Sequence, residues 1–205
     1  MLVAEKILIR QFGTAEYQPT VDAMRDFTAR RGADTPDELW LLEHPPVYTL
    51  GLAADAAHGP KTGGGIPVVQ VERGGEITYH GPGQVVLYTL VDLARRGIKV
   101  KQFVAMLEQS VIDLLGGRAE RKPGAPGIYV DGAKVAALGI RVSRGCAFHG
   151  LALNVDMDLT PFSVIDPCGH PGMKVTQTRD LGMPENKETL GRRLAGILVQ
   201  KLEHG

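Results

Sequence analysis

The chain has 205 residues, with 23 lysines and arginines balanced by 23 aspartates and glutamates. This length suits one domain with one buried core, and the balanced charge provides no overall field that would attract nucleic acid or an anionic membrane. No apolar run approaches the roughly 20 residues that cross a bilayer, and the amino end lacks the order of a secretory signal. We therefore expect a single cytoplasmic domain over residues 1–205, with no nucleic-acid or membrane partner.

In chain order, residues 2–10 predict a first strand, and residues 18–31 predict an amphipathic helix. Residues 39–43 and 47–50 are short apolar runs, separated by a His-Pro-Pro bend that cannot continue a ladder. We expect these two runs to pair with each other as strands. Residues 52–66 contain three successive glycines and predict a mobile loop at the rim of a site.

A glycine-rich block, residues 73–84, follows this loop. It is expected to join two strands, residues 67–72 and 85–93, and a helix is predicted over residues 98–115, before two glycines. The block lacks the spacing of a P-loop or of a dinucleotide fingerprint. Its bare backbone could receive developing negative charge on an oxygen, as acyl transfer requires, or it could be a purely structural turn.

The second half contains the clearest hairpin, in which Asp131-Gly132 provides a tight turn between residues 128–130 and residues 134–142. A strand over residues 146–155, a connection over residues 160–173 and a closing helix over residues 186–202 complete the chain. Strands outnumber helices and several adjoin directly. The expected fold is therefore α+β, with a mixed, largely antiparallel sheet flanked by helices.

The two cysteines are too few for a disulfide framework. Cys146 lies in an apolar strand and is expected to be a small buried residue. Cys168 lies between Pro167 and Gly169 on an irregular connection, where it is either a buried residue or a reactive thiol. Cys168 and His170 could supply two zinc ligands, but the chain offers no second ligand pair, so we expect no metal.

Lys134 stands in a strand of otherwise small and apolar residues. It is either a solvated strand lysine or, if buried, an amine whose neutral form is favoured and which can act as a base. His80 and His149 each follow an aromatic residue and precede glycine, and each taken alone predicts a satisfied buried histidine. His44, beside two prolines, predicts a turn residue.

Taken together, several segments resemble the lipoyl(octanoyl) transferases. The resemblance covers most of the chain in order, and its long glycine-histidine block is specific to that family. The matching segments are residues 43–51 (EHPPVYTLG), 73–84 (RGGEITYHGPGQ), 126–134 (PGIYVDGAK), 149–154 (HGLALN) and 167–169 (PCG).

The resemblance implies a fold similar to the catalytic domain of biotin and lipoate protein ligases. It implies an ATP-independent acyltransferase, without a cofactor, that moves an octanoyl group through a cysteine thioester. The donor would be octanoyl-acyl carrier protein. The acceptors would be lysines of lipoyl domains in 2-oxoacid dehydrogenases and of the glycine cleavage H protein.

The resemblance also assigns roles to residues. Cys168 would be the nucleophile, and Lys134 would promote ionisation of its thiol and shuttle protons. The expected lining of the acyl site consists of Arg73, Gly74, Gly75, Glu76, Ile77, Thr78, Tyr79, His80, Ala137, Leu138, Gly139, His149, Gly150, Leu151 and Ala152. Glycines 74, 75, 81 and 83 would let the backbone close around the acyl chain.

Two other functions fit parts of the sequence. One is a non-catalytic acyl binder that keeps the pocket, and the other is an ATP-dependent ligase. A local basic patch that includes Arg141 and Arg144 would suit acidic protein partners.

Overall fold

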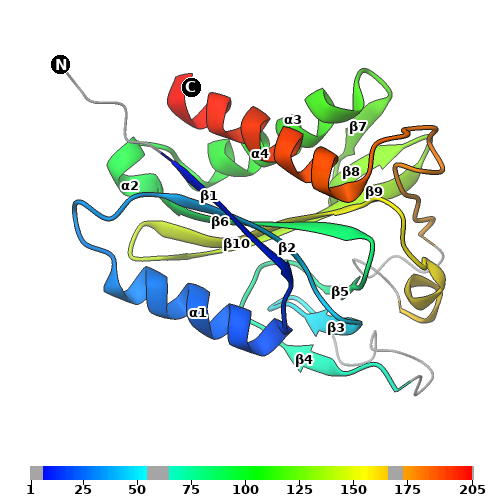
Figure 1. Cartoon of the computed structure of the whole chain (residues 1–205), viewed down its shortest axis with the longest axis horizontal. Helices are drawn as coiled ribbons and strands as arrows, with labels where there is room; N and C mark the ends of the chain where they lie inside the picture. Colours follow the sequence, from blue (N-terminus) through cyan, green and yellow to red (C-terminus); the bar gives the residue numbers. More distant parts are fainter. Residues whose placement is uncertain (1–6, 55–64, 166–172, 205) are drawn as a thin grey trace.

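The computed structural model describes residues 7–54, 65–165 and 173–204. A seven-stranded sheet forms the centre, with helix α1 on one face and helices α3 and α4 on the other (Figure 1). A three-stranded sheet lies on the same side as α1 (Figure 1). The described helices are α1 (Tyr17–Arg30), α2 (Leu93–Arg96), α3 (Val100–Leu115) and α4 (Lys187–His204), with a 3-10 helix at Thr160–Val164.

In the large sheet, the last four strands of the chain lie side by side in sequence order. In space the strands run β1 (Leu8–Thr14), β2 (Glu38–Glu43), β6 (Gln84–Asp92), β10 (Cys146–Asn154), β9 (Ala133–Ser143), β8 (Ala125–Val130) and β7 (Ala119–Lys122). The small sheet runs β4 (Val68–Gln70), β3 (Val47–Leu50) and β5 (Ile77–His80). Only β1–β2 and β3–β4 are parallel pairs among these strands. The predicted α+β fold with a mixed, largely antiparallel sheet is confirmed, whereas the single domain over all 205 residues stays a prediction.

The two faces of the large sheet bury different apolar sets. On one face, α3 and α4 present side chains such as Phe103 and Leu194 to strand residues such as Leu87. On the other face, α1 presents Val21 and Met24 to the alternate strand positions. Because successive residues of a strand point to opposite faces, the long apolar runs of β6 and β10 supply both cores.

The predicted pairing between residues 39–43 and 47–50 is wrong. Both strands exist, but β2 pairs with β1 and β6, whereas β3 pairs with β4 and β5 in the small sheet. The bend at His44 and the two prolines after it therefore moves the chain from one sheet to the other. Prolines cannot donate to a ladder, which is why the chain leaves the large sheet there.

Other elements also differ from the sequence predictions. The glycine-rich block does not merely join strands, because it contains β5 itself. Strand β7 was not predicted, since its four residues are mostly polar. The first described strand covers Leu8–Thr14, and the predicted start at residue 2 lies outside the described residues. Most of the predicted loop over residues 52–66 also lies outside them.

The Asp131-Gly132 hairpin is confirmed. Asp131 has a φ of 49° and Gly132 a φ of 81°, which is the positive pair that a tight primed turn requires. The turn fixes the register in which Tyr129 faces Lys134. A local turn signal therefore positions the lysine.

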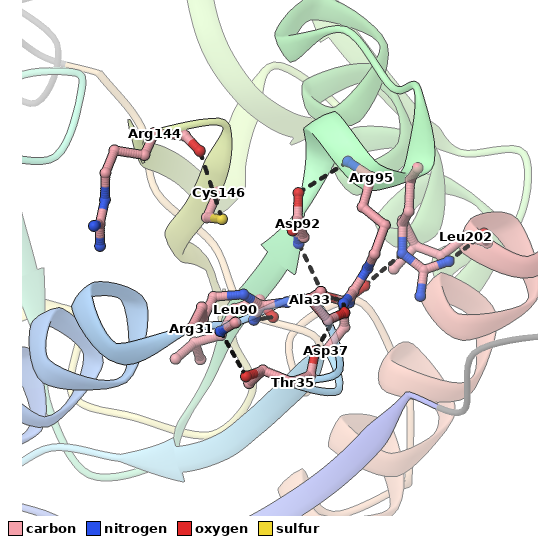
Figure 2. A network of polar contacts seen from close by, with 12 residues as sticks. Arg31, Ala33, Thr35, Asp37, Leu90, Asp92, Arg95, Arg144, Cys146 and Leu202 are labelled. Carbon is pink, nitrogen blue, oxygen red and sulfur yellow. Dashed lines mark hydrogen bonds and ion pairs between the residues drawn. The ribbon is translucent and has the colours of Figure 1, made fainter.

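A buried carboxylate ties the helices to the large sheet at one end. Asp37 has no exposed surface and forms ion pairs with Arg31, Arg95 and Arg96. Figure 2 shows this network, in which Asp92 also donates its backbone N–H to Asp37 at 2.8 Å. Arg96 in turn donates to the carbonyl oxygen of Leu202 in α4, at 3.1 Å. The network connects the end of α1, the start of β2, α2 and the end of α4.

In the part of the chain that the structure describes, no helix is both long enough and apolar enough to span a membrane.

Candidate active site

A cavity of about 240 Å³ opens on the α1 side of the large sheet. Strands β6, β9 and β10 form its floor, and strand β5 and the beginning of α1 form its walls. Its lining residues from these elements and the adjoining loops are Tyr17, Ala53, Arg73, Gly75, Glu76, Ile77, Thr78, His80, Gln84, Val86, Tyr88, Gly124, Pro126, Lys134, Ala137, Leu138, Gly139, His149, Gly150, Leu151, Ala152, Asn154, Phe162 and Val175. The middle of the floor, around Leu138 and Ala152, is apolar.

The structure brings nearly all the predicted binding residues, and Lys134, around this one cavity. The two exceptions are Gly74 and Tyr79. Gly74 donates its N–H to the carbonyl oxygen of Ile140 at 3.0 Å, which ties the glycine-rich block to β9. The Tyr79 ring packs edge-on against Phe162, with ring centres 5.5 Å apart. That the lining residues bind an acyl group stays a prediction.

Lys134 is buried, with 5% of its surface exposed, so of the two alternatives the solvated strand lysine is excluded. Its Nζ donates to the carbonyl oxygen of Pro126 at 3.0 Å and lies 5.4 Å from the centre of the Tyr129 ring. The backbone of Lys134 pairs with the segment around Val175, because its N–H donates to Lys174 O at 2.8 Å and its carbonyl accepts from Thr176 N at 2.9 Å. The lysine is therefore held by both its side chain and its backbone.

Cys168 and its neighbours, residues 166–172, lie outside the described residues. The chain reaches the cavity on both sides of this segment, since Phe162 before it and Val175 after it line the cavity. The role predicted for Cys168 stays a prediction. Cys146 is buried in β10, as expected, and burial raises the pKa of its thiol.

Arg73 supports the wall of the cavity from inside the protein. Its guanidinium donates to Thr49 at the carbonyl oxygen, 2.8 Å, and at the hydroxyl, 2.7 Å, and also to the carbonyl oxygen of Gly74 at 3.0 Å. These bonds connect the glycine-rich block to β3. Arg73 is only 8% exposed, and its charge helps to lower the pKa of the cavity residues His80 and His149.

Two of the four glycines expected to close around the acyl chain, Gly81 and Gly83, lie where the protein packs closely on itself. Of the four, only Gly75 lines the cavity within the described chain. A Cβ at Gly83 would lie 1.9 Å from the carbonyl oxygen of Asp156, and one at Gly81 would lie 2.2 Å from the hydroxyl of Tyr79. Gly81 and Gly83 therefore permit close packing of the protein on itself, because no larger residue would fit between these groups.

Two histidines and two tyrosines form a buried polar wall. His44 Nδ1 donates to the carbonyl oxygen of Ala15 at 2.6 Å, which leaves Nε2 to accept from the Tyr88 hydroxyl at 2.8 Å. The Tyr17 ring lies edge-on to His44 and stacks on His80 at 6.0 Å. Burial lowers the pKa of His44 to about 4 and that of His80 to about 3. Both imidazoles are neutral at pH 7.

A chain of side-chain amides connects this wall to the segment beside Lys134. His80 Nδ1 donates to Gln84 at 2.7 Å, and Gln84 donates to Asn154 at 2.9 Å. Asn154 donates to the carbonyl oxygen of Thr176 at 3.1 Å, and Thr176 is the residue whose N–H reaches Lys134. The prediction of a satisfied buried histidine is confirmed for His80.

His149 differs from this pattern. It is 1% exposed, and neither ring nitrogen has a hydrogen-bond partner among the described residues. Burial lowers its pKa to about 3, with the charge of Arg73 acting in the same direction. The prediction of a satisfied core histidine is therefore wrong at this position, although the residue does line the cavity.

Sequence reasoning missed several lining residues, of which Tyr17, Tyr88 and Phe162 are the largest. Tyr17 lies where α1 begins, and Tyr88 lies within an otherwise apolar strand. A tyrosine inside a run of buried strand residues was an available signal, because its hydroxyl must find a partner. No local pattern pointed to Tyr17 or Phe162.

The predicted basic patch at Arg141 and Arg144 does not adjoin the cavity. Arg144 donates to the carbonyl oxygens of Thr28 and Ala29, at 3.1 and 2.8 Å, and so closes the carboxyl end of α1. Among the described residues, no group of three or more histidine, cysteine and acidic side chains could hold a metal ion.

Comparisons with known proteins agree with this geometry. Residues 17–190 match the family model described as the lipoyl protein ligase A/B catalytic domain. An octanoyltransferase of Thiobacillus denitrificans is 59% identical over 96% of this chain and 91% of its own length. The octanoyltransferase of Dechloromonas aromatica is 54% identical over 96% and 97%, respectively.

Solved structures show the same fold at low sequence identity. A putative lipoate protein ligase from T. acidophilum with bound lipoic acid superposes with a TM-score of 0.73 at 15% identity, over 95% of this chain and 85% of that one. Lipoate-protein ligase A bound with ATP gives a TM-score of 0.68 at 14% identity, over 98% and 86%. The sequence resemblance is thus confirmed: the chain belongs to the lipoyl protein ligase A/B catalytic domain family, within its octanoyltransferases, and is an acyltransferase.

Proposed function

We propose that this protein transfers an octanoyl group from octanoyl-acyl carrier protein to a lysine of lipoyl domains, in the cytoplasm, through a thioester on Cys168. The acceptors proposed are the lipoyl domains of 2-oxoacid dehydrogenases and the glycine cleavage H protein. The names of the relatives support the octanoyl group and the acyl transfer. The donor, the intermediate and the acceptors are the further steps of the proposal.

One observation carries the mechanism. A buried amine, Lys134, lies at a cavity with an apolar middle, beside the segment that leads to Cys168. The carbonyl oxygen of Lys174 accepts from Lys134 N, and Lys174 is six residues after Cys168. Six residues span at most about 20 Å, so the chain keeps the thiol within that radius of the lysine backbone.

In the first half-reaction, the Cys168 sulfur attacks the thioester carbonyl of the donor. The bond from the carbonyl carbon to the carrier sulfur breaks, the new bond to Cys168 forms, and the carrier leaves as a thiol after taking a proton. A thiol is a few per cent ionised at neutral pH, so a nearby amine that accepts its proton speeds the attack. Lys134 is the group proposed for this proton transfer, from Cys168 to the departing carrier sulfur.

In the second half-reaction, the lysine amine of the acceptor attacks the acyl-Cys168 carbonyl. The carbon–sulfur bond breaks, an amide forms, and the proton lost by the incoming amine returns to the Cys168 sulfur through Lys134. The thioester of the donor already supplies the activation, so the reaction as proposed needs no ATP. This distinguishes it from the reaction of an ATP-dependent ligase.

The test is the mass of the intact protein after incubation with octanoyl-acyl carrier protein, without acceptor and without ATP. The expected result is one added octanoyl group, lost in Cys168→Ser and retained in Cys146→Ser. Addition of a lipoyl domain should remove the adduct and place it on the domain. An unmodified wild-type protein, or undiminished transfer by Cys168→Ser, would exclude the thioester on Cys168.

A further test separates the two activation modes. Free octanoate with ATP should yield no acyl transfer by the wild-type protein. Transfer under these conditions would favour a ligase.

A further inference from the structure

His149 has an unusual backbone for a residue in the middle of a strand. It lies within β10, yet its φ is 63°, in the left-handed region that non-glycine residues seldom adopt. The Thr89 hydroxyl donates to its carbonyl oxygen at 2.9 Å and holds the peptide in this conformation. Such strain persists where the surroundings require it, and it is found most often at functional sites.

The consequence of this backbone is the direction of the imidazole. In a regular strand, His149 would face away from its neighbour Phe148. Instead the two rings stack at 5.1 Å, and the His149 ring lies edge-on to Tyr88 at 5.8 Å. Phe148 and Tyr88 both belong to the apolar set on the α1 side. The positive φ therefore turns the imidazole to the side of the sheet that holds the cavity.

The imidazole is buried there without a hydrogen-bond partner for either nitrogen among the described residues. Burial lowers its pKa to about 3, so the ring is neutral and offers one N–H donor and one acceptor nitrogen. A buried polar group left without a partner is costly, and a ligand that supplies the partner recovers that cost. The strained backbone and the unpartnered ring are two independent signs of a ligand contact.

The distance from Lys134 places this contact at the far end of an acyl chain. A Cβ on Gly127 would lie 2.9 Å from Cε of Lys134 and 2.8 Å from the carbonyl oxygen of Ala136, so the amine end of the lysine is level with Ala136. His149 is the register partner of Ile140, four residues further along β9. Four strand residues extend about 13 Å, which is the scale of a medium acyl chain. Between these ends the cavity is lined by Leu138 and Ala152.

We propose that His149 is the specificity-determining residue for the distal end of the acyl chain, and that it admits medium-chain acyl groups carrying a hydroxyl on the terminal carbon. This inference rests on the proposed function, because it takes the acyl carbonyl to lie at Lys134. A terminal hydroxyl donates and accepts, so it can satisfy whichever nitrogen of the neutral imidazole it meets. The hydroxyl does not react: the same thioester breaks and the same amide forms as with octanoyl.

The experiment compares octanoyl-acyl carrier protein with 8-hydroxyoctanoyl-acyl carrier protein, each as sole donor to a lipoyl domain. The quantity measured is the ratio of kcat/KM for the hydroxylated donor to that for the plain donor. Two variants at His149 should retain the backbone conformation of the wild-type protein, since glycine and asparagine both tolerate a positive φ. His149→Gly removes both nitrogens, and His149→Asn retains a donor and an acceptor. Ile140→Val, which changes the register partner outside the cavity, is the control.

The wild-type protein should use the hydroxylated donor, and His149→Gly should lower the ratio about tenfold, the effect of one lost hydrogen bond to substrate. His149→Asn should retain most of the ratio, and Ile140→Val should leave it unchanged. A shift of melting temperature with free 8-hydroxyoctanoate, smaller in His149→Gly than in the wild type, is the readout independent of activity.

Two results would overturn the inference while leaving the proposed function intact: octanoyl transfer with no use of the hydroxylated donor, or an unchanged ratio in His149→Gly. An unchanged ratio in which both donors lose rate equally would mean that the imidazole only binds a water molecule or shapes the cavity wall. Absence of transfer from both donors in the folded wild-type protein would instead refute the proposed function.

Discussion

Lys134 Nζ lies 3.0 Å from the carbonyl oxygen of Pro126, so the side chain of one strand of the hairpin is tied to the backbone of the other. This bond fixes the amine at the edge of the cavity. It also means that the position of the amine depends on the path of the chain at Pro126 and Gly127.

Replacing Lys134 with methionine should slow formation of the acyl adduct. Methionine retains an unbranched stem of similar length but cannot exchange a proton. The expected loss is about 100-fold to 10,000-fold in the single-turnover rate, the usual contribution of one proton-transfer group. Rapid-quench mass spectrometry would measure it. Lys134→Arg should be slow as well, because a guanidinium remains protonated. A methionine variant as fast as wild type would remove Lys134 from the mechanism.

Replacing Gly127 with alanine should displace the side chain of Lys134 without changing the chemical identity of residue 134. The residue has a φ of 132°, and a Cβ would approach Lys134 Cε to 2.9 Å and Ala136 O to 2.8 Å. We expect a lower rate of acylation together with lower stability. Gly182→Ala is the matched control, because Gly182 also has a positive φ but no atom within 4 Å of the added Cβ. Equal effects of the two variants on acylation would contradict a specific displacement of Lys134.

Stability should fall as the pH drops below about 6. The lowered pKa values of His44, His80 and His149, about 4, 3 and 3, mean that the unfolded chain binds protons near pH 6.5 whereas the folded chain does not. Each histidine should then cost on the order of 1 kcal/mol per pH unit between about pH 6 and pH 4. Urea unfolding at pH 7, 6 and 5 would measure the slope.

Acidic side chains with lowered pKa values should not produce the loss of stability between pH 7 and pH 5. The pKa values of Glu38 and Glu43 are lowered in the folded protein, so their stabilisation is lost only at more acidic pH, as the pH falls below about 4.5. His44→Gln should reduce the slope between pH 7 and pH 5, because it removes one of the three buried imidazoles. A wild-type stability that is constant between pH 7 and pH 5 would contradict the assignment of neutral buried imidazoles.

Replacing Asp37 with asparagine should destabilise the fold by about 3 kcal/mol or more, because three buried or largely buried arginines would lose their common carboxylate. The exposed pair of Arg30 with Asp26 is the control, and Asp26→Asn should cost less than about 0.5 kcal/mol. Chemical denaturation would measure both. At a temperature where Asp37→Asn is folded, acylation should be close to normal, since α1 separates this network from Tyr17 at the cavity.

The features that were predicted correctly depend on residues near one another in the chain. The Asp131-Gly132 turn specifies its hairpin locally, and the amphipathic spacing of α3 and α4 appears in their buried positions. The partners of β2 and β3 were not predictable in this way. Whether two short apolar strands pair with each other or join different sheets is decided by contacts with β6 and β5, which are far away in the sequence.

The residues of the candidate site also fall into a group that was predictable from local sequence and a group that was not. The likeness to the family identified Lys134 and most of the lining, because those residues occur in contiguous motifs. The polar wall joins Tyr17 from α1, His44 from the bend after β2 and Tyr88 from β6, and only the folded chain brings them together. The positive φ of His149 is also a tertiary effect, since it is supported by the Thr89 hydroxyl on the next strand.

The two faces of the large sheet are covered unequally. Two long helices, α3 and α4, lie over one face, whereas α1 and the small sheet lie over the other (Figure 1). The cavity opens on this second face. An octanoyl chain in that cavity would act as additional hydrophobic core, at about 0.8 kcal/mol for each methylene removed from water. The acylated protein should therefore melt at a higher temperature than the free protein, and loss of the acyl group would return it to its less stable form.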